Sequence, residues 1–471
     1  MKKGLLFQSI GQFGNVIVTL VINVILSRLL RPEDFGIVGM VQIFVLFFSL
    51  ITVQSTIPAI IQNKELNRED YGVLFNYSLL LGISLAVLFG LFGFALAAIL
   101  DNQIYVPVSW AMSLYIISES ANTIPRGILS KEKRFKEINI RFLIALTLGA
   151  IIGIASTFLG AGIYALIIVA AVPSAVALFL NLPIVDIKFT RSFNPQPVKK
   201  IIFFAKNQMG FSVINYAYRN LDNLLVGKFM GPAALGNYTK SYQLISFPIT
   251  VILGIVSPVI QPILSVHEQN KELIRNTFLK ACQLLALLAV PLSVFFCLNA
   301  QQVVYLLFGN QWTNAILPFA ILSLSIWAQM LAQIIIVFWQ SRNLPHLLLR
   351  NGLISLGIIG ASIIIGILSG SLVGVAIAVA VSYVINFLVS SSMLMRIGLD
   401  GTIREMLYVL VKPLILGVLL FVALFFIQPY LVFGNLFVTL VVRLVVWLVL
   451  VAVYLLVSRD YKVIVSFMRK K

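Results

Sequence analysis

Residues 207–236 read NQMGFSVINYAYRNLDNLLVGKFMGPAALG, a stretch that is long and apolar enough to cross a membrane as one helix. Its polar side chains recur every three or four residues, which places them on one helical face. They are Gln208, Ser212, Asn215, Arg219 and Asp222. Charged groups at membrane depth are costly and usually face a protein interior or a watery cavity. The stretch therefore predicts a helix that lines a polar region inside a membrane protein.

The same polar face recurs 200 residues earlier in the chain, with no gap in the offset. Identical polar, Pro and Gly pairs at this offset include Gln8 and Gln208, Asn15 and Asn215, Asn23 and Asn223, Pro32 and Pro232, Gly36 and Gly236, Pro58 and Pro258, and Asn76 and Asn276. Their agreement over about 70 residues predicts two homologous halves, each opening with a polar-striped helix. Internal repeats are common in secondary transporters, where the substrate site lies at the repeat interface.

Composition places the chain among polytopic membrane proteins. Of 471 residues, 60% are hydrophobic and only 11% are charged, which no soluble globular domain matches. Apolar stretches predict about 14 transmembrane helices, among them residues 37–61, 203–229 and 313–340. The predicted fold class is an all-α polytopic membrane protein with two homologous six-helix lobes and two C-terminal helices. An outer-membrane barrel is excluded because its strands are short and alternate in polarity.

The distribution of positive charge predicts the orientation in the membrane. The net charge is +18, and the lysines and arginines gather in every second loop. The loops assigned to the outside hold only Arg28, Arg31, Lys228 and Lys240. This bias predicts that both termini are cytoplasmic, and it explains the basic balance without a nucleic-acid partner.

The domain limits follow from the repeat and from the linker that carries Asn194-Pro195-Gln196-Pro197. We expect an N-terminal lobe (1–183), a cytoplasmic linker (184–202), a C-terminal lobe (203–395), and two appended helices with a basic tail (396–471).

An ordered set of motifs resembles a known family. The motifs of the first half are residues 27–36, SRLLRPEDFG, and Pro125-Arg126 with Lys133-Arg134-Phe135. Those of the second half are Asp222-Asn223, Gly231-Pro232, Leu235-Gly236-Asn237-Tyr238, and Leu307-Phe308-Gly309 with Trp312. Together they look like the Wzx-like polysaccharide flippases, of colanic-acid type, in the multidrug/oligosaccharidyl-lipid/polysaccharide exporter superfamily. The resemblance covers essentially the whole chain.

The resemblance implies alternating-access export of an undecaprenyl-pyrophosphate-linked oligosaccharide across the bacterial cytoplasmic (inner) membrane. Exopolysaccharide, capsule, O-antigen and teichuronic-acid-type polymers all remain open as its product. Expected partners are the lipid-linked oligosaccharide, membrane lipid, a polysaccharide polymerase and glycosyltransferases. We expect a monomer.

Arg219 is the leading candidate for binding the substrate phosphates, because an arginine holds phosphate through a forked set of donors. The amides of Gln8, Asn15, Asn23, Gln208, Asn215 and Asn223 can donate to and accept from sugar hydroxyls. Asp222 lies three residues after Arg219, so it either pairs with Arg219 or binds a coupling H⁺ or Na⁺.

Three further charged residues are candidates for substrate binding. Glu119 falls mid-span with Arg126 on the same face, and the alternative for Arg126 is that it extends to the cytoplasmic surface. Arg443 falls within the last apolar stretch and either binds substrate phosphate, pairs with another helix, or packs.

The sequence predicts neither an enzyme nor a cofactor. The phosphate-binding pattern GxxxxGK[ST] is absent, and His267 and His346 have no partner at metal-ligand spacing. Two alternatives remain open: a cation-coupled drug exporter of the same superfamily, and a membrane polysaccharide polymerase or ligase. Two acids and two arginines inside apolar stretches favour an anionic or zwitterionic substrate over a cationic drug.

Overall fold

The chain forms two compact units, Met1–Gly236 and Asn237–Lys471. The computed structural model describes residues 2–265, 270–342 and 344–461. Within these ranges, the side chains of residues 2–13, 54–55, 203–208, 210–215, 217–219, 255–265 and 345 lie outside the description. All regular structure in the described ranges is helical, which confirms the predicted all-α class.

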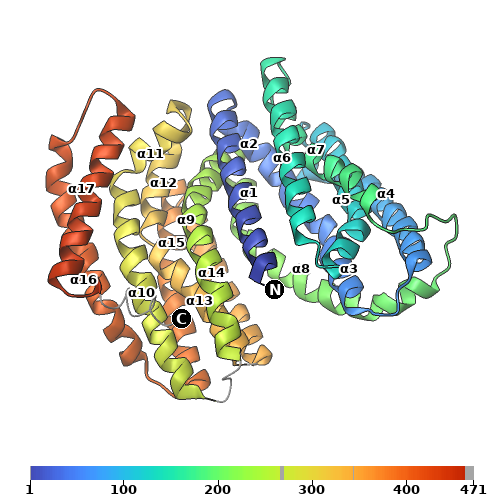
Figure 1. Ribbon diagram of the computed structural model, residues 1–471. Helices are drawn as coiled ribbons and strands as arrows, with labels where there is room; N and C mark the ends of the chain where they lie inside the picture. Colours follow the sequence, from blue (N-terminus) through green and yellow to red (C-terminus); the bar gives the residue numbers. More distant parts are fainter. Residues whose placement is uncertain (1, 266–269, 343, 462–471) are drawn as a thin grey trace. The chain divides into compact units, whose positions relative to one another are not determined.

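The first unit is a bundle of long helices (Figure 1). They are α1 (Lys2–Leu29), α2 (Pro32–Leu50), α3 (Val53–Gln62), α4 (Arg68–Ile99), α5 (Tyr105–Lys131), α6 (Phe135–Phe158), α7 (Tyr164–Asn181) and α8 (Gln196–Met230). Helix α5 is central, because it packs against α4, α7, α3 and α2. A cluster around Ile60, Tyr71, Ile124 and Ile201 joins the ends of α3, α4, α5 and α8.

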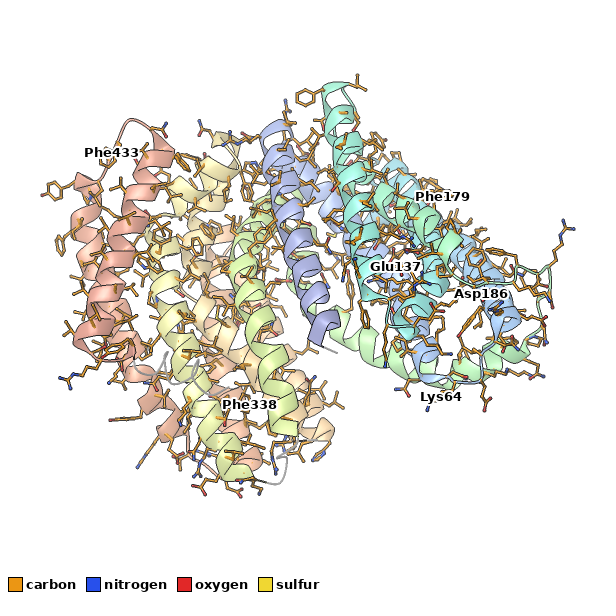
Figure 2. All side chains as sticks on the ribbon, viewed as in Figure 1. Lys64, Glu137, Phe179, Asp186, Phe338 and Phe433 are labelled. Atoms are coloured by element: carbon orange, nitrogen blue, oxygen red, sulfur yellow. The ribbon has the colours of Figure 1, made fainter. Side chains whose placement is uncertain are left out.

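The second unit is also helical, and α9 leads into it from the first. Its helices are α9 (Pro232–Ser265), α10 (Lys271–Leu298), α11 (Ala300–Leu307), α12 (Thr313–Ser323), α13 (Ile326–Ser341), α14 (Pro345–Leu368), α15 (Leu372–Met393), α16 (Ile403–Ile427) and α17 (Leu436–Val457). Helix α10 packs along α16, α14 along α15, and α13 against both α10 and α15. Phe338 of α13, which Figure 2 labels, packs edge-on against Phe278 of α10, with ring centroids 4.9 Å apart.

Many of these helices are long and apolar enough to span a bilayer. Nine helices of the described ranges meet this test by length and composition, or ten if the bent pair α12–α13 counts as one span. Their exposed faces carry large apolar side chains, for example Phe179, Ile365 and Val418. In a protein that buries its polar groups inside, such faces suit contact with lipid. The chain is a multi-pass membrane protein.

Two stretches predicted as single helices, 37–61 and 313–340, are interrupted. Helix α2 ends before Thr52, whose hydroxyl donates to the Ser49 carbonyl at 3.1 Å. Helices α12 and α13 meet at an angle of 57°, and the Ser325 hydroxyl at this break donates to the Leu322 carbonyl at 2.7 Å. Hydroxyl groups that bond to nearby carbonyls compete with the helical ladder. Apolar periodicity does not reveal such competition, so both breaks were missed.

Lys240, predicted to belong to an outer loop, is instead a buried residue of α9. Its side chain is 2% exposed, and its ammonium lies 5.0 Å from the ring centroid of Phe308 and 5.7 Å from that of Trp312. Aromatic faces stabilise a cation that has lost its water. The prediction from loop charge therefore misplaced this lysine.

The connection between α7 and α8 is fixed to α4. The Asn76 amide donates to the Thr190 carbonyl at 2.6 Å, and the Tyr77 hydroxyl to the Phe193 carbonyl at 2.6 Å. Arg68 pairs with Asp186, which Figure 2 labels. Helix α8 begins at Gln196, earlier than the expected 203, because Pro197 suits the first turn of a helix. We call residues 185–195 the linker.

Alanine at Gly72 is expected to release the linker from α4. A Cβ atom at this position would lie 2.1 Å from the Lys188 carbonyl oxygen, so the linker backbone would have to shift. Overpacking of this kind costs about 1–3 kcal/mol, so trypsin should cleave after Lys188 or Arg191 about tenfold faster in the purified variant. Gly39→Ala is the control, since its Cβ would meet no heavy atom within 4 Å. Equal cleavage of both variants would contradict the prediction.

Candidate functional site

The first unit contains a charged pair on one face of α5. Arg126 donates from Nη1 to Glu119 Oε1 at 3.4 Å across two helical turns. The Glu119 side chain is 15% exposed, whereas that of Arg126 is 44% exposed. The distance is at the long end for a hydrogen bond, so the guanidinium is held weakly and retains donors for an anion.

Two polar residues of α7 complete this cluster. The Ser174 hydroxyl donates to Glu119 Oε2 at 2.5 Å, and the Asn181 amide donates to Asn122 Oδ1 at 3.0 Å. Glu119 and Arg126 were predicted from the sequence, whereas Asn122, Ser174 and Asn181 were not. The signal for Ser174 and Asn181 was their spacing of seven residues on an otherwise apolar helix, which places them on one face.

The polar faces of α1 and α8 are described in part. Asn15 Oδ1 and Asn223 Oδ1 are buried and have no hydrogen-bond partner among the described residues. The Asn23 amide donates to the Thr19 carbonyl at 2.9 Å. A buried amide oxygen that lacks a donor is costly, so such oxygens need an explanation, and a bound hydroxyl group is one.

The remaining predicted residues of these helices divide into two groups. Asp222 is 9% exposed, and its Oδ1 accepts from the Asn223 backbone N–H at 2.8 Å. Four of the side chains predicted to bind phosphate or sugar lie outside the described part of the structure. They are those of Gln8, Gln208, Asn215 and Arg219. The predicted contact between Arg219 and Asp222 stays a prediction.

The repeated Pro and Gly positions meet in a reciprocal contact at the starts of α2 and α9. A Cβ atom on Gly36 would lie 1.7 Å from the Pro232 carbonyl oxygen, and one on Gly236 would lie 1.9 Å from the Pro32 carbonyl oxygen. The contact is reciprocal, because each glycine lies against the carbonyl of the proline in the other segment. Glycine is required on both sides, because only a residue without Cβ permits backbones to approach this closely. We call this contact the glycine crossing.

Arg443 of α17 lies in a different place, within the second unit. Its residue is 5% exposed, and its guanidinium donates to the carbonyls of Leu431 at 3.2 Å and Gln428 at 3.1 Å, and to Asn299 Oδ1 at 3.3 Å. These carbonyls follow the C-terminus of α16, where a cation is favoured by the helix dipole. The contacts explain the buried charge structurally, and phosphate binding by Arg443 stays a prediction.

The described residues offer no metal site, since no group of three His, Cys, Asp or Glu side chains among them could hold an ion. The chemistry available at Glu119, Arg126 and the asparagines is binding of anions and hydroxyl groups.

Two curated proteins are similar to this chain over most of its length. The succinoglycan biosynthesis transport protein ExoT of Rhizobium meliloti (strain 1021) is 25% identical over 317 residues, which are 67% of this chain and 63% of that protein. The lipopolysaccharide biosynthesis protein WzxC of Escherichia coli (strain K12) is 23% identical over 301 residues, 62% of this chain and 60% of that protein. The alignments thus span somewhat less than two thirds of each relative.

A solved structure shares the fold. The lipid II flippase MurJ, in an inward closed conformation, superimposes with a TM-score of 0.77 at 15% identity, covering 97% of this chain and 99% of that one. At this identity the likeness concerns the fold alone.

More than half of the chain matches the model of a known protein family. The model described as "Polysaccharide biosynthesis protein" matches residues 25–317. This match covers more than half of the chain and agrees with the family that the motifs predicted. The chain therefore belongs to the polysaccharide biosynthesis protein family.

Proposed function

We propose that this chain is a membrane transporter that flips an undecaprenyl-pyrophosphate-linked oligosaccharide from the cytoplasmic to the outer leaflet by alternating access. Membership of the polysaccharide biosynthesis family supports the proposal, as do relatives whose names assign them to succinoglycan transport and lipopolysaccharide biosynthesis. The observation that carries it is the half-exposed guanidinium of Arg126, held by one long bond to the largely buried Glu119.

Arg126 is placed to receive the pyrophosphate. It lies near the end of α5, the end that faces the cytoplasm in the proposed orientation. The phosphates of a lipid carrier in the inner leaflet reach the protein at this depth. A doubly charged phosphate competes with the single carboxylate of Glu119 for the guanidinium, and a planar fork of donors suits phosphate oxygens.

Asn15 and Asn223 are proposed to bind the glycan. Their buried side-chain oxygens lack donors among the described residues, and sugar hydroxyls would supply them. Arg219 is a second proposed phosphate ligand and Asp222 a proposed site for a coupling cation. Both proposals rest on the sequence pattern.

The proposed arrangement in the membrane has fourteen spans, with α2–α3 and α12–α13 each forming one interrupted span. Both termini then face the cytoplasm, and the protein belongs to the bacterial inner membrane, as the charge bias indicates. The two repeats rock against each other during transport, while a polymerase and glycosyltransferases act on the same polymer. The protein transports its substrate without altering it covalently.

The test is leaflet transfer of an undecaprenyl-pyrophosphate-linked oligosaccharide in proteoliposomes, measured by the access of an external glycosidase. Arg126→Gln is expected to slow transfer about 10- to 100-fold, because a hydrogen bond to a charged group contributes about 1.5–3 kcal/mol. Arg191→Gln, in the exposed linker, is the control and should transfer at the native rate.

Protein amount and monodispersity in detergent are measured for each variant, so that misfolding is separated from lost binding. Native transfer by Arg126→Gln would remove Arg126 from the site. Absence of transfer by the unsubstituted protein would overturn the proposed function.

A further inference from the structure

Two tyrosines from distant parts of the second unit meet between α9 and α15. The hydroxyl groups of Tyr242 and Tyr383 are in direct contact, and their ring centroids lie 6.4 Å apart at 49°. Tyr238, which is fully buried, packs against the Tyr242 ring with centroids 5.7 Å apart. Tyr242 and Tyr383 are only half-buried, so part of each side chain remains accessible.

These tyrosines lie far from either end of their helices. Helix α9 begins at Pro232 and α15 at Leu372, and a helix rises about 1.5 Å per residue. Tyr242 and Tyr383 therefore lie about 15 Å along their helices from these starts. In the proposed arrangement both helices enter from the outer surface, so the two tyrosines lie well inside a membrane whose hydrocarbon core is about 30 Å thick. Polar groups at this depth are costly unless they serve a partner or a ligand.

A third polar group lies on the same side of α15. Asn386 follows Tyr383 by three residues, which places both on one helical face. Asn386 is 6% exposed, and its Oδ1 is buried with no hydrogen-bond partner among the described residues. A contact between the two tyrosine hydroxyls satisfies those hydroxyls but leaves this oxygen without a donor. Helix–helix packing alone therefore does not explain the group.

The chemistry of these three side chains fits one class of ligand. Aromatic rings offer a flat apolar surface, phenol hydroxyls both donate and accept, and an amide oxygen accepts. A sugar ring presents an apolar C–H face together with several hydroxyl groups. A phosphate would call for cations, and an acyl or prenyl tail would need no polar atoms.

We propose that Tyr242, Tyr383 and Asn386 form a glycan-binding subsite near the middle of the membrane. The proposal rests on the proposed function, since it assigns residues to the sugar part of the same substrate. Tyr242 and Tyr383 bind the sugar by stacking and through their hydroxyls, and Asn386 accepts a hydrogen bond from a sugar hydroxyl. The subsite holds the glycan while it passes between the leaflets.

The test compares two lipids that differ only in the sugar. Binding of undecaprenyl pyrophosphate is measured beside binding of undecaprenyl-pyrophosphate-linked trisaccharides, one of neutral hexoses and one rich in N-acetylhexosamine. The Tyr242→Phe/Tyr383→Phe protein lacks both hydroxyls and keeps both rings. It is expected to bind at least one glycosylated lipid about tenfold more weakly and the bare lipid unchanged.

Tyr408→Phe is the matched control, because Tyr408 is 80% exposed and belongs to α16, a helix that contributes no residue to the subsite. Asn386→Leu, of similar volume, provides a second variant if the tyrosine variant does not fold, and the same selective loss is expected. A thermal melt of each protein accompanies the binding curves.

Three results would overturn the subsite. One is equal weakening for bare and glycosylated lipids. Another is unchanged binding of every lipid in both variants, whether or not the melting temperature falls. The tyrosine contact would then only join two helices. The third is that the unsubstituted protein does not prefer any glycosylated lipid over the bare one. If it binds the bare lipid, the proposed function survives that result; if it binds neither, both fail.

Discussion

Alanine at Gly36 or Gly236 is expected to slow substrate transfer about 10- to 100-fold. At the glycine crossing, each new Cβ would lie less than 2 Å from a proline carbonyl oxygen of the opposite segment, where real Cβ atoms essentially never lie closer than 3.0 Å. The two backbones would have to separate by more than about 1 Å, and packed interiors resist such strain. The proposed alternating access requires each side to close in turn, so a wedge at the starts of α2 and α9 would penalise one of the two proposed states.

Spin labels at Glu33 and Ala233 measure this separation, since both residues are exposed and occupy equivalent positions in the repeat. We expect the distance between the labels to increase in Gly36→Ala and in Gly236→Ala. It should be kept in Gly39→Ala, where a Cβ meets open space on the same helix. Native transfer and unchanged label distances in both crossing variants would refute the role given to this contact.

Arg443→Ala is expected to destabilise the second unit by about 3 kcal/mol. The substitution removes three donated hydrogen bonds and leaves the Leu431 and Gln428 carbonyls and Asn299 Oδ1 without this partner. Thermal melting in detergent measures the effect. Arg443→Lys should be intermediate, because it keeps the charge but loses the planar fork that reaches several acceptors.

Arg350→Ala is the control for this series, as Arg350 is an exposed arginine of the same unit. If Arg443→Ala melts like the unsubstituted protein, the structural account of Arg443 is wrong. Weaker phosphate-lipid binding at unchanged stability would instead favour the sequence prediction that Arg443 binds substrate.

Much of the architecture was predictable because its causes are local. Apolar stretches of sufficient length predicted a membrane protein of many helices, and nine or ten spans of the described ranges are long and apolar enough to cross a bilayer. The offset of 200 residues predicted two homologous halves, which stays a prediction. The pairing of Glu119 with Arg126 follows from their spacing on one helical face. The glycine crossing brings together Pro and Gly positions that share this offset.

What the sequence could not predict depends on contacts between distant segments. The spacing of Ser174 and Asn181 indicates a shared face of α7, but their partners on α5 are known only once α7 is placed against α5. Lys240 was assigned to a loop because aromatic partners 68 and 72 residues further along the chain are invisible to a charge count. Tyr242 and Tyr383 carry no pattern that relates them. Tertiary packing decides each of these cases.

The attachment of the linker to α4 has a consequence for the order in which the chain is built. The α4 groups that hold the linker, such as Asn76 and Tyr77, precede it in the sequence, as do Asn63 and Asp70, which bind Lys200 at the start of α8. Every one of these partners has left the ribosome before the linker emerges. This end of the first unit is thus able to assemble during synthesis, before the helices of the second unit are made.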